Sequence, residues 1–278
     1  MAKRPNSRRN LDMAIRRLGD EEGDYERNRF LITNAIVGQM LSGAVVKGGA
    51  ALKFRYGEEA TRTTTDLDIA IATSVEKFLE TLDSRLREGW EGFTGRLELR
   101  PKAHPDGVPS AYVMQPCEIK LSYLGVPWCT VHLEIGSNEI GDADESEMME
   151  SRDAKDLLAA LGFPAPGPTP LMLSEYQIAQ KLHASSEPGS MRAHDLVDLQ
   201  IILKNEDIEL GRLSHTCERL FAYRGKHHWP PTVTSGAGWD DLYSAASREV
   251  DAADDLDDAL RIANDLIEEL ADISTKEQ

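Results

Sequence analysis

One short segment constrains the fold of this chain more than any other. From Asp66 to Ala72, apolar and polar residues alternate as they do in a strand with one buried and one exposed face. The apolar face carries Leu67, Ile69 and Ile71, and the opposite face carries Asp66, Asp68 and Ala70. Such a strand belongs in a sheet whose apolar side is covered. The segment therefore predicts a sheet that displays two carboxylates on its open face.

The rest of the chain divides into a mixed first part and a helical second part. Amphipathic patterns in the first part predict helices over 24–41, 50–56 and 75–86, and strands over 96–100, 111–123 and 129–135. The segment PAPGPTP at 164–170 is the best linker candidate. Only helical patterns follow it, over 174–183, 191–204, 210–223 and the acidic tail. We therefore expect an α+β chain, with a mixed sheet flanked by helices over 1–163 and a helical domain over 171–278.

Length and charge narrow the class of protein. The chain has 278 residues, with 31 Lys+Arg against 48 Asp+Glu and a net charge of −17. Three cysteines without metal-site spacing argue against a disulfide framework and favour a reducing, cytoplasmic compartment. No apolar stretch is as long as a membrane span, so no membrane partner is expected. The acidity argues against general nucleic-acid binding, although a local basic groove is compatible with it.

Both ends of the chain carry uneven charge. The basic run over residues 3–17 is interpreted as a solvated terminus rather than as an arm that binds nucleic acid. From Asp240 onward there are 13 acidic and 3 basic residues, a net charge of −10. An apolar stripe from Val250 to Leu270 predicts that this tail packs on the helical domain. The alternative is that the tail covers a nucleic-acid groove as a mimic of RNA.

Two features indicate phosphate and metal chemistry. Gly48-Gly49 closes a strand and opens a helix, which lets backbone N–H groups approach a phosphate. Asp66 and Asp68 project from one strand face, where their like charges repel unless a cation lies between them. Glu134, on the polar face of another strand, would add a third carboxylate, and such a set suits two magnesium ions. A plain turn and a solvated strand are the structural alternatives.

The spacing of these residues resembles a known signature. Gly48-Gly49, a short helix and then Arg62-x-Thr64-x-Asp66-Leu67-Asp68 are similar to the active-site signature of the AbiEii-type nucleotidyltransferase toxins. These toxins are a branch of the polymerase-beta-like nucleotidyltransferase superfamily that includes the mycobacterial MenT toxins. The family's helical part is matched by YQIAQKLHA and MRAHDLVDL, at Lys181, Arg192, Asp195 and Asp198. The resemblance extends from Ala44 to Lys204.

The resemblance implies a nucleotidyltransferase-like fold and a specific chemistry. It implies transfer of a nucleotidyl group from an NTP to a tRNA 3′ end, dependent on Mg²⁺ or Mn²⁺, by a toxin that a cognate antitoxin silences. The implied catalytic residues are Asp66, Asp68, Lys181 and Asp195. The implied nucleotide-binding residues are Gly48, Gly49, Arg62, Thr64, Lys181 and Arg192. The implied metal ligands are Asp66, Asp68 and Glu134.

The residues by themselves leave other functions open. The same fold could transfer a nucleotidyl or phosphoryl group to a protein hydroxyl, which the net acidity favours because tRNA is a polyanion. A non-catalytic nucleotide-binding module is the third possibility, and the joint presence of Asp66, Asp68 and Lys181 argues against it. As structural alternatives, Lys181 would be a solvated helix residue and Arg192 with Asp195 a surface pair. His227-His228-Trp229 is interpreted as a loop anchor rather than as a base-stacking or metal patch.

Overall fold

The computed structural model describes residues 2–19, 23–103 and 113–277. The chain forms two compact units, Met1–Glu58 with Thr64–Leu171 and Glu59–Thr63 with Met172–Gln278. The segment Glu59–Thr63 therefore packs with the helices of the second unit, although the chain on either side of it belongs to the first. No helix within the described ranges is long and apolar enough to cross a membrane.

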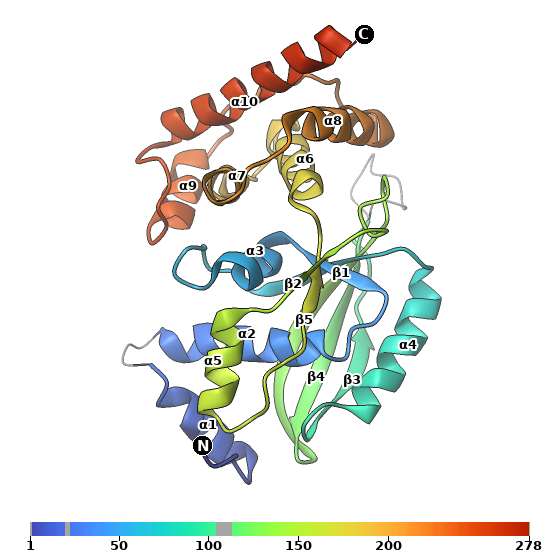
Figure 1. The fold of residues 1–278 in the computed structure, drawn as a ribbon, viewed down its shortest axis with the longest axis vertical. Coiled ribbons are helices and arrows are strands. Elements are labelled where there is room, and N and C mark those ends of the chain that lie inside the picture. Colours follow the sequence, from blue (N-terminus) through green and yellow to red (C-terminus); the bar gives the residue numbers. More distant parts are fainter. Residues whose placement is uncertain (1, 20–22, 104–112, 278) are drawn as a thin grey trace. The chain divides into compact units, whose positions relative to one another are not determined.

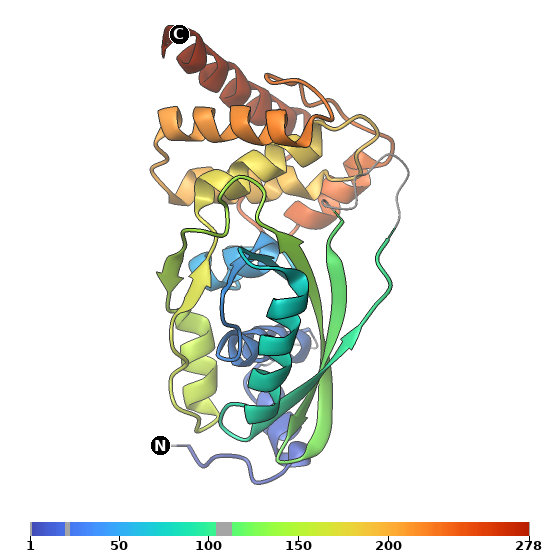
Figure 2. The ribbon, with the colours of Figure 1, turned by 90° about the vertical axis from the view of Figure 1, so that its right-hand side faces the viewer.

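The first unit contains a seven-stranded sheet and five helices within the described residues (Figures 1 and 2). Its strands are β1 (Ala44–Lys47), β2 (Asp66–Ile71), β3 (Phe93–Leu99), β4 (Gln115–Tyr123), β5 (Val126–Ser137), β6 (Glu147–Met149) and β7 (Thr169–Leu171). Its helices are α1 (Arg8–Arg16), α2 (Asp24–Gly38), α3 (Gly48–Tyr56), α4 (Val75–Glu88) and α5 (Arg152–Ala160).

The sheet is mixed, as the sequence predicts. Its strand order is β3-β4-β5-β2-β1-β7-β6. β2 pairs in parallel with β5, and β1 with β7, whereas the other neighbours are antiparallel. β2 and β5 therefore lie side by side although more than fifty residues separate them along the chain. The prediction of an α+β fold with a mixed sheet and flanking helices is confirmed.

One face of the sheet is apolar and the other is polar. Leu67, Ile69 and Ile71 of β2 are at most 1% exposed and join a core cluster with residues of α1, α2 and α4. The opposite face carries a row of charged or polar residues paired across four strands: Glu98, Glu118, His132 and Asp66. The alternation read from β2 thus holds across the sheet, and the carboxylates of β2 lie on its polar face.

The N-terminal segment is not a solvated terminus, so that interpretation is wrong. Helix α1 buries Leu11 and Ile15 completely in the core of the first unit. Before it, Arg4 Nη1 donates a 2.6 Å hydrogen bond to Glu91 Oε2, and the Arg4 guanidinium lies 4.9 Å from the centroid of the Phe163 ring. The many Arg and Lys residues of this segment obscured its amphipathic pattern, in which Leu11 and Ile15 are the two apolar positions that anchor the helix.

Two short strands, β6 and β7, were not predicted. Leu171 pairs with Val46 of β1, and β6 pairs antiparallel with β7. The last part of the proline-rich segment is therefore a strand of the sheet rather than a linker. Proline lacks an N–H, but Pro170 sits in a strand of three residues, where few ladder bonds are needed. Residues 111–112, where the predicted strand over 111–123 begins, lie outside the described residues.

The second unit is helical within its described residues. Its helices are α6 (Ser174–Ser186), α7 (His194–Asn205), α8 (Leu210–Arg224), α9 (Trp239–Ser247) and α10 (Leu256–Glu277). α10 contacts α7, α8 and α9 and buries an apolar stripe of Leu256, Ala259, Ala263, Leu266, Ile267 and Leu270. The acidic tail therefore packs on the helical unit, as predicted. The helix begins later than its stripe suggested, since Val250 and Ala253 precede it.

A buried aromatic cluster joins α6, α8 and the loop after α8. The His183 ring lies 4.8 Å from that of Phe221 and 4.6 Å from that of His227, and Trp229 lies 5.1 Å from Phe221. His183 Nε2, His227 Nδ1 and Trp229 Nε1 are buried and have no hydrogen-bond partner among the residues that the structure describes. Burial, aided by the charge of Arg224, lowers the pKa of His183 to about 3. His227 and Trp229 anchor the loop, and His183 stays neutral inside it.

The His183 cluster predicts a pH dependence of stability. Below about pH 6.5 the unfolded chain binds a proton at this position that the folded chain does not, so stability falls as the pH drops towards 3. For the wild type, His183 alone accounts for a loss of about 2 kcal/mol between pH 7 and 5. We expect His183→Phe to remove this pH-dependent loss in the free energy of unfolding. The measurement is unfolding by urea at pH 7 and at pH 5. His215→Phe, at an exposed position of α8, is the matched control and should leave the wild-type difference unchanged.

Candidate active site

Three carboxylates share the polar face of two neighbouring strands. Asp66 and Asp68 lie two residues apart on β2 and project to the same side. β5 runs parallel to β2 with Glu134 directly opposite Asp68. Asp66 Oδ2 accepts a hydrogen bond of 3.2 Å from Thr65 Oγ1. The sheet thus brings Glu134 beside the two aspartates. The sequence alone predicted a strand for Glu134 but not the position of that strand in the sheet.

The Gly48-Gly49 turn approaches this strand closely. Gly48 has a φ of +64°, a left-handed conformation that disfavours residues with a Cβ, and an added Cβ would lie 2.4 Å from Asp68 Oδ2. A Cβ added at Gly49 would lie 2.9 Å from Thr64 Oγ1. The start of α3 therefore lies against Asp68 and Thr64, where only glycine leaves room for both side chains.

Lys47 belongs to the same polar face, although no motif spacing singled it out. It lies opposite Asp68 in the antiparallel pair of β1 and β2. Its Nζ is 3.1 Å from the position that a Cβ of Gly136 would occupy, and Gly136 follows Glu134 by two residues on β5. Lys47 therefore reaches across β2 to β5 and places its ammonium group next to Gly136, on the polar face that also carries the carboxylates. The only signal in the sequence is its position directly before the two glycines.

The carboxylates fit magnesium in combination with a substrate. Across the described ranges, no three His, Cys, Asp or Glu side chains converge as ligands of one metal ion. Magnesium is usually held by one or two carboxylates together with water and substrate phosphates. The pair Asp66 and Asp68 meets that requirement by its chemistry and spacing. Coordination by Glu134 stays a prediction.

The close approach of Gly48 predicts a large effect of a single methyl group. Gly48→Ala would put a Cβ against the Asp68 carboxylate and displace it. We expect the rate of nucleotidyl transfer, the activity that the sequence resemblance implies, to fall about a hundredfold. A displacement of about 1 Å in a reacting geometry has an effect of this size. Gly43→Ala is the matched control, because Gly43 also has a positive φ of +74°, but apart from its chain neighbours no described residue has a heavy atom within 4 Å of an added Cβ. Both variants should lose about 1 kcal/mol of stability, and only Gly48→Ala should lose activity.

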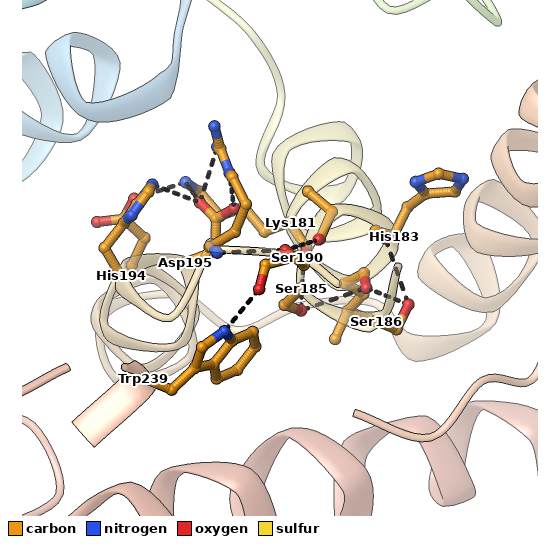
Figure 3. A network of polar contacts seen from close by, with 12 residues as sticks. Lys181, His183, Ser185, Ser186, Ser190, His194, Asp195 and Trp239 are labelled. Carbon is orange, nitrogen blue, oxygen red and sulfur yellow. Dashed lines mark hydrogen bonds and ion pairs between the residues drawn. The ribbon is translucent and has the colours of Figure 1, made fainter. Parts of the chain in front are cut away.

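The second unit holds a compact cluster of five charged side chains. Lys181 Nζ donates to Asp195 Oδ1 at 3.1 Å and to Asp198 Oδ2 at 2.6 Å. Arg62 Nε and Nη2 donate to the two carboxylate oxygens of Asp198, each at 2.8 Å. Arg192 Nε donates to Asp195 Oδ2 at 2.7 Å. Lys181 therefore sits between two carboxylates, and each carboxylate also has its own arginine. Figure 3 labels Lys181 and Asp195 of this cluster.

The degree of burial distinguishes three buried members of this cluster from the exposed Arg192. Asp195 and Asp198 are fully buried and Lys181 is 5% exposed, so Lys181 is not a solvated helix residue. The Arg192 side chain, by contrast, is 52% exposed. Three cations and two carboxylates leave one surplus positive charge, and Arg192 carries the most accessible part of it. The sequence signal for this burial is that Asp195 and Asp198 stand among apolar residues on α7.

The ion pairs control the protonation of the cluster. Burial alone would raise the pKa of Asp195, but the charges of Lys181 and Arg192 outweigh it and hold that pKa below its usual range. The same balance, with Lys181 and Arg62 as the cations, lowers the pKa of Asp198. Burial lowers the pKa of His194 to about 4. At neutral pH the two carboxylates are therefore charged and His194 is neutral.

The loop before α7 is fixed by backbone contacts. Trp239 Nε1 donates to the Ser190 carbonyl at 2.7 Å, and Ser190 Oγ donates to the Ala184 carbonyl at 2.6 Å. The Arg192 N–H donates in turn to Ser190 Oγ at 3.2 Å. Figure 3 shows Trp239 beneath Ser190. These bonds hold the backbone that presents Arg192 next to the cluster.

Comparison with known protein families shows to which family the chain belongs. Residues 30–274 match the family described as "Nucleotidyl transferase AbiEii toxin, Type IV TA system". The chain belongs to this AbiEii family. Its members are nucleotidyltransferase toxins of type IV toxin–antitoxin systems, as the description states. The match covers β2, the glycine turn and the cluster around Lys181. No curated protein sequence matches the chain.

Two solved structures have a similar course of the chain. MenT4, a nucleotidyltransferase toxin from Mycobacterium tuberculosis H37Rv, is 18% identical, with 95% of this AbiEii chain and 99% of that chain covered and a TM-score of 0.51. JHP933 from Helicobacter pylori is 16% identical, with 93% and 97% covered and a TM-score of 0.48. The likeness to MenT4 shows a shared fold, which is the nucleotidyltransferase-like fold expected from the sequence.

Proposed function

We propose that this AbiEii protein transfers a nucleotidyl group from an NTP to the 3′ end of a tRNA, in a reaction that requires magnesium or manganese. The observation that carries the proposal is the register of β2 and β5. It places Asp66, Asp68 and Glu134 on one polar face, and Asp68 lies against the glycine turn that opens α3. Carboxylates next to a helix N-terminus that can receive phosphate are the elements that metal-dependent phosphoryl chemistry needs.

In this proposal the residues of the first unit hold the reacting groups. Asp66 and Asp68 would hold the metal, with Glu134 as the third carboxylate, and backbone N–H groups at Gly48 and Gly49 bind phosphate beside Thr64. A metal held there would lower the pKa of the attacking hydroxyl and neutralise charge on the leaving pyrophosphate. The acceptor oxygen forms a bond to the α-phosphorus, the bond to pyrophosphate breaks, and the hydroxyl proton passes to solvent.

The charged cluster of the second unit is proposed to act on the triphosphate. Arg192, with its half-exposed guanidinium, is the residue best able to contact phosphate directly. Arg62 and Lys181 are the further nucleotide-binding cations, and Asp195 orients Lys181 and Arg192. A direct contact of Lys181 with phosphate stays a prediction, since its Nζ is held by two carboxylates. The surplus charge of the cluster would stabilise negative charge that develops on the leaving group.

The acceptor and the reaction can be tested together. The chain is incubated with α-labelled or γ-labelled NTPs, plus either total tRNA or cell-lysate protein, with Asp66→Asn as the inactive control. Label from the α-phosphate in the tRNA fraction, abolished by EDTA, is expected. Label only in protein would overturn the tRNA acceptor, and label only from the γ-phosphate would indicate phosphoryl transfer. Magnesium-independent NTP binding without turnover would favour a binding module. Co-expression with the cognate antitoxin is expected to relieve growth inhibition by the wild type.

A further inference from the structure

Lys47, at the end of β1, carries a cation without an ionic partner. Its ammonium group forms no hydrogen bond or ion pair with any residue that the structure describes. In the second unit, by contrast, carboxylates hold both Lys181 and Arg62. Lys47 is half-buried, so it has lost part of its contact with water. A cation that has lost hydration and gained no partner favours the binding of an anion.

The side chain of Lys47 crosses the polar face of the sheet. Lys47 is opposite Asp68 of β2, and its Nζ lies 3.1 Å from the position that a Cβ of Gly136 on β5 would occupy. Gly136 is opposite Ala70, and both residues are buried. The Lys47 side chain therefore passes from β1 to β5 where the side chains beneath it are small. Ala70 and Gly136 leave the room that its ammonium group takes.

The Lys47 ammonium group shares this face with three carboxylates without pairing with them. Asp66, Asp68 and Glu134 lie on the same side of β2 and β5, and no ion pair joins them to Lys47 in the described part of the chain. Neighbouring strands are about 5 Å apart, so the charge of Lys47 acts on the carboxylates without contact. It offsets their mutual repulsion, and it repels a divalent metal ion that approaches them. Lys47 therefore lowers the affinity of the carboxylates for a metal ion alone.

A substrate phosphate on this face would reverse the effect of Lys47. A magnesium ion held by one or two carboxylates takes further ligands from substrate phosphates, which places those phosphates on the same face. The turn Gly48-Gly49 directly follows Lys47, lies against Asp68 and can offer backbone N–H groups to phosphate. An ammonium group on a flexible stem is a common phosphate ligand. The triphosphate of an NTP is therefore the anion that fits the Lys47 ammonium group.

We propose that Lys47 binds the triphosphate of the NTP and makes metal binding depend on it. Without NTP, the ammonium group repels a metal ion from Asp66 and Asp68. With NTP, it pairs with phosphate, whose negative charge outweighs that repulsion. The metal ion and the NTP then favour each other's binding. This inference rests on the proposed function for the identity of both ligands, and it adds a residue to which that function gave no role.

The test is titration calorimetry of the full chain without an acceptor, with Mn²⁺ alone and with each NTP in saturating Mg²⁺. Lys47→Met keeps most of the stem and removes the charge. It is expected to lower the Kd for Mn²⁺ about fivefold, because a like charge is lost. It is expected to raise the Kd for the NTP about tenfold, because a charge-assisted hydrogen bond is lost. A purely structural role of Lys47 would weaken the binding of both ligands.

Three further variants control this experiment. Lys47→Arg keeps the charge and should leave both constants within about threefold of the wild type. Lys77→Met makes the same charge change on α4, which covers the apolar face, and should leave both within about twofold. Mn²⁺ that Asp66→Asn still binds is subtracted as background. If Lys47→Met is too unstable to titrate, Lys47→Gln replaces it with the same expectations.

The outcomes separate the role of Lys47 from the proposed reaction. A folded Lys47→Met variant that binds Mn²⁺ no more tightly than the wild type, or the NTP no more weakly, overturns that role even where the wild type labels tRNA. If the two constants shift in opposite directions as expected but the wild type labels no acceptor, the role of Lys47 stands and only the reaction is overturned. A wild type that binds neither Mn²⁺ nor any NTP would overturn both.

Discussion

Asp66→Asn and Asp68→Asn are each expected to lower nucleotide transfer by at least about a thousandfold, an increase of about 4 kcal/mol in the activation barrier. The amide keeps the shape of the carboxylate but removes the charge that holds the metal. We expect Asp66→Asn to stay as stable as the wild type or to gain slightly, because it removes one of two neighbouring negative charges on β2. The measurement is the initial rate of α-label transfer, together with the thermal midpoint of each variant.

Glu98→Gln is the matched control for this experiment. Glu98 lies in the same row of the polar face as Asp66, but on β3, with β4 and β5 between them. It pairs with Arg96 at 2.6 Å and with Lys120 at 3.8 Å, on a strand that is three positions from β2 in the sheet. Its loss should leave the rate within about twofold, since surface ion pairs contribute little. A rate within a few-fold of wild type in Asp66→Asn or Asp68→Asn would refute the assignment of the reacting carboxylates.

Local patterns made the first part of the site predictable. The alternation over β2 shows which side chains share a face, and two glycines at a strand end show where the backbone must turn. The register between β2 and β5 was not predictable, because it joins residues more than sixty positions apart and depends on the packing of the whole sheet. Lys47 was missed for the same reason. Its importance comes from the strands that lie beside β1, not from its own neighbours in sequence.

In the second unit, a different property could not be predicted from the sequence. The positions of Lys181, Asp195 and Asp198 were recognised from motifs, but their mutual ion pairs and burial were not. Asp195 and Asp198 stand three residues apart in a helix whose other residues from Leu196 to Ile202 are buried. That arrangement places both carboxylates inside the unit and requires cations from elsewhere. Arg62 comes from a segment more than a hundred residues earlier, and only the fold shows that it meets Asp198.

Lys181→Met is expected to lower the free energy of unfolding by about 3 kcal/mol, because two charge-assisted hydrogen bonds inside the protein are lost. Asp195 and Asp198 keep Arg192 and Arg62, but no cation then lies between them. Transfer should also fall by about a hundredfold if the cluster stabilises charge on the leaving group. Lys204→Met on the same helix bundle is the control, since Lys204 is 54% exposed and pairs with the exposed Asp251. That variant should change stability by less than about 0.5 kcal/mol.

A second substitution separates the structural role of Lys181 from its role in the reaction. In Lys181→Met with Asp195→Asn, the repulsion between the two carboxylates disappears, so at least about half of the lost stability should return. This double variant also restores the surplus positive charge of the cluster, so activity should return with stability if that surplus charge acts on the leaving group, and should stay low if the Lys181 ammonium group itself contacts the triphosphate. Recovery of both stability and activity would therefore rule out a direct role of Lys181 at the triphosphate. A single Lys181→Met variant as stable as the wild type would contradict the buried ion pairs. The comparison works because Asp195 is neutralised without changing its size, while Arg192 and Arg62 remain in place.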